Sequence, residues 1–156
     1  MNSLYPKTQT NLNQLVADIS QLTLIVHQTH WYMRGKTFFT MHPKMDELMA
    51  DLDDQLDQIA ERLIAIGGEP LSTFGEFLET TKLEEKKGKF GIPMENLIQH
   101  LVEDYRYLKD VFQEGIDISG KEDDYSTQDM LIGMKTDIEK TIWMLQAFLD
   151  KSPLAE

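Results

Sequence analysis

Four stretches of the sequence repeat apolar residues at intervals of three and four positions, the spacing that places them on one face of an α-helix. The stretches occupy residues 10–34, 38–66, 93–116 and 130–149. Thr8 or Thr10 is a candidate N-cap for the first. Gly35 and the Gly67-Gly68 pair provide stops, and Ser152 and Pro153 follow the last stretch. The sequence contains no strand signals, so it predicts an all-α bundle of four long helices.

The connection between the second and third helices is long, spanning residues 67–93. Within it, Thr73 and Glu76 have the spacing of a capping box, which predicts a short helix over residues 74–83. The segment SGKEDDYST, residues 119–127, is interpreted as a turn. One long crossover between helices two and three is typical of a ferritin-like four-helix bundle. We expect residues 1–156 to form a single domain of this kind.

Composition excludes several classes of function. The chain has no cysteine, so any metal must be bound by His, Asp and Glu. Its formal net charge of −12 argues against a broad phosphate-binding face, while it fits either simple solubility or attraction of cations. The N-terminus lacks the basic and apolar segments of a signal peptide, and no apolar run could span a membrane. We therefore expect a cytoplasmic protein.

The second helix carries a separate line of potential metal ligands. His42, Asp46, Asp57 and Glu61 fall in one sector beside the apolar face. Each i,i+4 pair, His42 with Asp46 and Asp57 with Glu61, can place two side chains around one ion. Ligands of this kind, without sulfur, suit non-haem iron, with manganese, cobalt or zinc as alternatives.

The two pairs are too far apart to share an ion. Asp46 and Asp57 are separated by roughly 16 Å along the helix axis, given a rise of about 1.5 Å per residue, whereas ligand bonds measure about 2 Å. The midpoint of His42 and Glu61 nevertheless coincides with that of Asp46 and Asp57. If two copies of the helix cross antiparallel near residues 50–52, the His42–Asp46 pair of one copy meets the Asp57–Glu61 pair of the other. A two-fold dimer would then hold two equivalent composite sites.

His30 lies on the apolar stripe of the first helix, one hairpin away from His42 and Asp46, so we assign it to the same site. His27 lies about 60° off that stripe and is either an outer neighbour of the site or a packing residue. A di-iron site within one chain would require Glu-x-x-His motifs. The chain has none, and His100 precedes Glu103 in the reverse order.

The sequence resembles the Dps family, the miniferritins named for DNA protection during starvation. The resemblance covers nearly the whole chain. It is carried by HWYMRGKTFFTMH at residues 30–42, Asp46, DQIAERLIAIGGEP at residues 57–70 and DMLIGMKTDIEKTIWMLQAFL at residues 129–149.

The resemblance implies a hollow shell of twelve subunits with ferroxidase centres at the two-fold interfaces. His30, His42 and Asp46 would come from one subunit, and Asp57 and Glu61 from its mate. Such proteins oxidise Fe²⁺, preferentially with hydrogen peroxide, and store a ferric mineral. The implied function is therefore that of a ferroxidase and iron-storage protein acting against oxidative stress.

Other residues have weaker assignments. Trp31 and Trp143 are interface packing residues or quenchers of radical equivalents near the iron. Asp123, Asp124 and Asp129 cap the fourth helix, and the resemblance also places them near acidic pores through which iron enters. DNA compaction is the alternative function. However, the N-terminal tail has one lysine, Lys7, and the C-terminal SPLAE is not basic. We therefore expect a peroxide-resistance type without a DNA-binding tail and without direct nucleic-acid binding.

Overall fold

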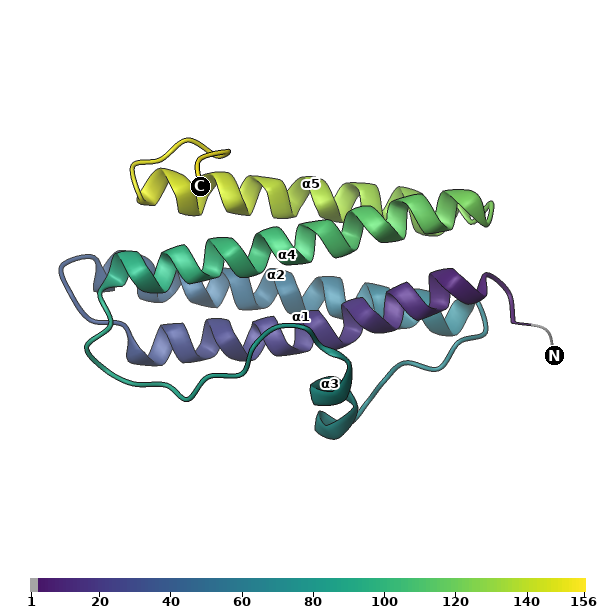
Figure 1. Ribbon diagram of the computed structural model, residues 1–156, viewed down its shortest axis with the longest axis horizontal. Coiled ribbons are helices and arrows are strands. Elements are labelled where there is room, and N and C mark those ends of the chain that lie inside the picture. Colours follow the sequence, from purple (N-terminus) through teal and green to yellow (C-terminus); the bar gives the residue numbers. More distant parts are fainter. Residues whose placement is uncertain (1–2) are drawn as a thin grey trace.

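The computed structural model describes residues 3–156, which form five helices and, over that range, no strand. Four long helices lie side by side, and a short helix stands beside them on the crossover (Figure 1). The all-α bundle and its crossover helix are thus confirmed. No helix in this range is long and apolar enough to cross a membrane. The helices are α1 (Pro6–Tyr32), α2 (Phe38–Ala65), α3 (Phe74–Thr80), α4 (Met94–Lys121) and α5 (Tyr125–Phe148).

The apolar stripes of the four long helices meet in one core. α1 packs against α2 and α4, and α4 packs against α5. Aliphatic side chains dominate this core, joined by two large aromatic ones. The largest fully buried side chains include Leu12, Leu15, Ile19, Leu22, Leu52, Ile59, Leu63, Tyr105 and Phe112. The polar face of α2 is left outside the bundle, and it carries the carboxylates of interest.

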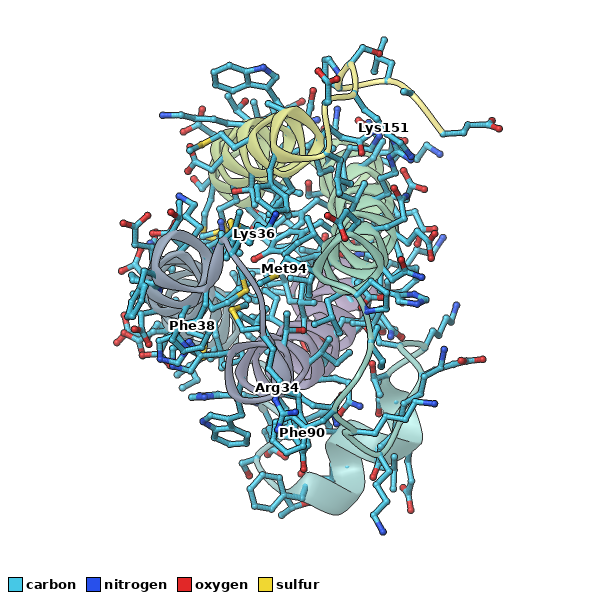
Figure 2. The ribbon with its side chains drawn as sticks, turned by 90° about the vertical axis from the view of Figure 1, so that its left-hand side faces the viewer. Arg34, Lys36, Phe38, Phe90, Met94 and Lys151 are labelled. Carbon is cyan, nitrogen blue, oxygen red and sulfur yellow. The ribbon has the colours of Figure 1, made fainter. Side chains whose placement is uncertain are left out.

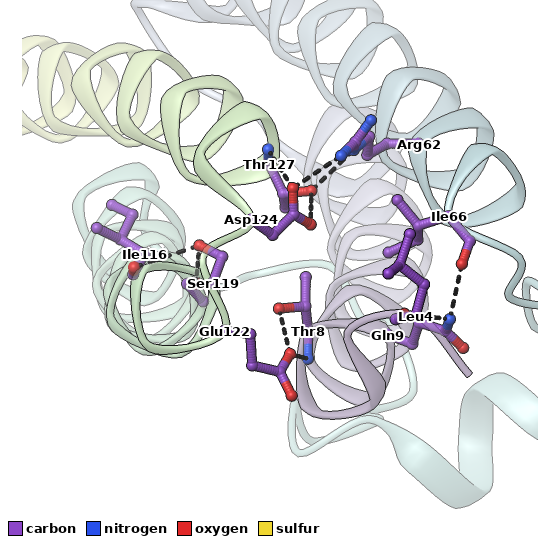
Figure 3. Close-up of polar contacts among 11 residues, drawn as sticks. Leu4, Thr8, Gln9, Arg62, Ile66, Ile116, Ser119, Glu122, Asp124 and Thr127 are labelled. Carbon is purple, nitrogen blue, oxygen red and sulfur yellow. Dashed lines mark hydrogen bonds and ion pairs between the residues drawn. The ribbon is translucent and has the colours of Figure 1, made fainter. Parts of the chain in front are cut away.

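The first helix begins four residues earlier than the predicted Thr10, and the predicted threonine caps are wrong. Pro6 occupies its first turn, where the fixed φ of proline suits a helix start. The N-cap residue is Tyr5, which makes no side-chain capping bond. The Thr8 hydroxyl instead donates to Glu122 at 2.8 Å, and so does its backbone N–H (Figure 3). Glu122 follows α4 and ties it to the start of α1.

The crossover is held to the bundle by a buried carboxylate. Thr73 and Glu76 form the predicted capping box. α3 nevertheless ends at Thr80, three residues before the predicted end. The chain turns there because the Thr81 hydroxyl and the Lys82 N–H both donate to Asp18, at 2.8 and 3.2 Å. Asp18 is fully buried on α1. It also accepts from Gln14 and Tyr107.

The turn between α4 and α5 is much tighter than residues 119–127. α4 continues to Lys121 and α5 begins at Tyr125. Asp124 caps α5 by accepting from the Thr127 N–H at 3.1 Å, as predicted for an acid at this position. It also forms an ion pair with Arg62 of α2 at 2.7 Å (Figure 3). The start of α5 is therefore fixed to the end of α2.

Candidate metal centre

His30 and His42 face each other where α1 ends and α2 begins. Their imidazole rings stack with centroids 3.5 Å apart and planes inclined by 10°. His30 Nδ1 lies 2.8 Å from the backbone carbonyl of His42, and His42 Nδ1 lies 2.9 Å from the carbonyl of His30. Phe38 stacks on the second ring at 4.6 Å. Each histidine is thus oriented by the backbone of the other.

This reciprocal contact fixes the tautomer that each ring adopts in its neutral form. A carbonyl oxygen can only accept, so each Nδ1 carries the hydrogen and each Nε2 keeps its lone pair. A histidine that binds a metal through Nε2 requires such a partner at Nδ1. His30 Nε2 lies 3.6 Å from Asp46 Oδ1. The structure therefore places His30 beside both His42 and Asp46 and orients the two histidine rings.

Asp57 and Glu61 lie on the same uninterrupted helix as His42 but farther along it. Both are exposed. Because α2 is continuous from Phe38 to Ala65, roughly 16 Å of axial rise separates Asp57 from Asp46. Within residues 3–156, no group of three or more His, Asp or Glu side chains is arranged to hold a metal ion. One chain presents two separate ligand groups.

Of the three other aromatic candidates, His27 and Trp31 lie on α1 close to His30 in the sequence, and Trp143 lies on α5. His27 packs against Trp31 with ring centroids 5.1 Å apart. Its Nδ1 is buried and has no hydrogen-bond partner in the described part of the chain. The side chains of Trp31 and Trp143 are 58% and 51% exposed. Both tryptophans are surface residues of this chain. His27 lies against Trp31, about one helical turn along α1 from His30.

The three acidic residues near the start of α5 have different surroundings. Asp124 is only 2% exposed and is engaged by Arg62 and Thr127. Asp123 has a positive φ of 60° and accepts from the Tyr125 hydroxyl at 2.9 Å. Asp129 lines a groove between α2 and α5. Asp123 and Asp129 present exposed carboxylates, whereas that of Asp124 is buried in its ion pair with Arg62. The pore assignment of all three stays a prediction.

Known proteins are similar to this chain in both fold and sequence. A ferritin-like domain model matches residues 9–155. The X-ray structure of Dps from Listeria monocytogenes superimposes with a TM-score of 0.93 and 47% identity, covering 95% of this chain and 96% of that one. This chain belongs to the Dps family. The DNA protection during starvation protein of L. monocytogenes is 48% identical over 147 residues, 94% of either chain. That of Streptococcus suis is 49% identical over 142 residues, 91% of this chain and 83% of the relative.

Membership of the Dps family confirms the ferritin-like topology predicted from the long crossover. The ligand set itself, His30, His42, Asp46, Asp57 and Glu61, stays a prediction from spacing and from the geometry of the two histidines.

Proposed function

We propose that this Dps protein oxidises Fe²⁺ with hydrogen peroxide and stores the ferric product inside a shell of twelve chains. The observation that carries the proposal is the reciprocal His30–His42 contact, which leaves both Nε2 lone pairs free, that of His30 at 3.6 Å from Asp46 Oδ1. It supports a site prepared for a cation that accepts nitrogen and oxygen ligands. Iron is the substrate here.

The proposed ligands differ in charge and therefore in what they contribute to iron binding. Asp57 and Glu61 supply most of the negative charge that favours Fe³⁺ over Fe²⁺, while His30 and His42 are neutral donors. Asp46 either binds iron directly or orients a water molecule. Two ferrous ions give up one electron each, and one peroxide takes both electrons with two protons to form two waters. Because the electrons arrive as a pair, no hydroxyl radical is released.

The exposed face of α2 supports a site shared by two copies. Ala50, Asp57 and Ala60 line a shallow hollow on this face, near the point where two antiparallel helices would cross. Small residues at a crossing allow helices to approach closely. The chain also exposes large apolar side chains that a partner would cover: Trp31, Phe39, Ile64 and Phe74.

Adding Fe²⁺ without oxygen, followed by one peroxide per two irons, is expected to produce rapid ferric absorbance. Consumption of peroxide in that ratio reports the paired electron transfer, and a spin trap should detect little radical. Bovine serum albumin at equal iron is the control for uncatalysed oxidation. An absorbance rise no faster than that of this control would exclude the ferroxidase function.

Protection of DNA, from which the relatives take their name, is proposed to act through iron chemistry and not through direct contact. Six of the fifteen basic residues are nevertheless gathered at the α1–α2 turn and the crossover: Arg34, Lys36, Lys82, Lys86, Lys87 and Lys89. A gel shift at low salt without Mg²⁺ is expected to show no complex. A complex that disappears when Lys86, Lys87 and Lys89 are changed to Gln would establish direct binding by the crossover.

A further inference from the structure

A cavity of about 450 Å³ lies between α1, α4 and the crossover, away from the metal ligands. Its walls include the rings of Tyr32 and Tyr107 and the aliphatic side chains of Ile92 and Leu101. A hollow of this size has the dimensions of a small-molecule site, and its walls combine apolar and aromatic side chains with charged ones.

The crossover is closely fitted over this cavity. Gly88 lies against Tyr32, and a Cβ atom at position 88 would come within 2.4 Å of the Tyr32 ring. Phe90 packs on the same tyrosine at 4.8 Å, and the Arg34 guanidinium lies 3.8 Å over the Phe90 ring (Figure 2). The wall that the crossover contributes is therefore held by specific contacts.

Asp104 of α4 lines the cavity as a half-buried carboxylate without a donor. Within residues 3–156, no hydrogen bond or ion pair reaches it. The other polar groups that line the interior are engaged elsewhere. The Tyr107 hydroxyl donates to Asp18, the Thr29 hydroxyl to the Ile25 carbonyl, and the Gln28 amide to the Lys86 carbonyl. The oxygens of Asp104 are not fully buried, so water reaches them, and a donor on a ligand could take the place of that water.

The charges around Asp104 do not supply a counter-ion. His100 and Glu103 face it from α4, and Lys86 and Glu84 from the crossover. Lys82, Lys87 and Lys89 of the crossover also line the cavity, but none of them forms an ion pair with Asp104 in the described part of the chain. Glu103 lies 3.7 Å from His100, and Glu84 lies 3.3 Å from Lys86. Tyr32 is the only titratable α1 residue in the lining. Burial is the largest influence and raises the pKa of Asp104 to about 6.

We propose that this cavity binds a small organic ammonium ion, whose nitrogen pairs with Asp104 and whose apolar or aromatic body lies against Tyr32 and Tyr107. An ammonium group supplies the donor that the carboxylate lacks, and tyrosine rings attract cations and pack against apolar groups. The crossover lysines that line the cavity are exposed, so a comparison of an ammonium ligand with a carboxylate ligand decides which charge the cavity accepts. The site is independent of the iron chemistry.

Calorimetric titration of the assembled protein with 2-phenylethylamine is expected to show binding at pH 7, weaker at pH 5. The amine stays protonated over this range, and only the ionised form of Asp104 pairs with it. With a pKa of about 6, the ionised fraction and hence the affinity should fall about tenfold between these values. Phenylacetate, which has a similar body and the opposite charge, should not bind.

Asp104→Asn preserves the shape of the side chain and is expected to weaken binding about tenfold or more. Asp110→Asn, at an exposed site on the same helix, is the matched control and should leave affinity unchanged. Crystals soaked with the 4-bromo derivative should give an anomalous bromine peak inside the cavity. Preference for phenylacetate, equal binding by the Asp104 variant, a bromine peak elsewhere, or no binding at millimolar amine would each overturn the proposal.

Discussion

Asp57→Ala and His42→Ala are each expected to lower the rate of iron oxidation by about 100-fold or more, since each removes a ligand from every composite site. Oligomers that contain both variants should regain activity. In a two-fold dimer of one variant with the other, one site carries both substitutions and the other carries neither. Random mixing in equal amounts should therefore restore about a quarter of the sites.

The measurement is the initial rate of ferric absorbance for the two variants, separately and after co-expression with different affinity tags. Light scattering should give a mass near that of twelve chains for all of them, so that lost activity is not lost assembly. Asp110→Ala, at an exposed position on α4, is the matched control and should keep the native rate. Purified mixed oligomers that oxidise iron no faster than the single variants would contradict an intersubunit site.

The main features of the fold follow from the sequence because helical periodicity and axial rise are fixed by the backbone. The apolar stripes are enough to predict four long helices, and the distance between Asp46 and Asp57 is enough to separate two ligand groups. Helix ends are less predictable. The first helix begins at Pro6, and the threonine expected to cap it bonds instead to Glu122, a partner 114 positions away in the sequence.

The orientation of the histidines could not be predicted in the same way. It depends on how residues 33–37 fold the chain back, which places the carbonyl of each histidine opposite the other's Nδ1. Spacing on a helical wheel carries no information about that turn. Asp104 was also not anticipated, because its lack of a partner becomes visible only once α1 and the crossover close around it.

The Arg62–Asp124 pair illustrates the same limit and leads to a large expected effect on stability. Arg62→Met should lower the free energy of unfolding by about 3–5 kcal/mol, because it leaves a buried charge without its partner. The Asp124 side chain is 1% exposed and lies 2.7 Å from Arg62, whose Nε also donates to the Thr127 hydroxyl at 2.8 Å. The pair joins the end of α2 to the start of α5.

Thermal unfolding at one fixed protein concentration checks this prediction, since assembly makes the midpoint depend on concentration. Lys86→Met breaks an ion pair with Glu84 whose side chains are 68% and 80% exposed, so it should cost less than about 1 kcal/mol. The double variant Arg62→Met with Asp124→Asn should recover part of the loss, because asparagine still caps α5 and carries no charge. A single Arg62 variant as stable as the Lys86 control would mean that the buried carboxylate does not need the arginine.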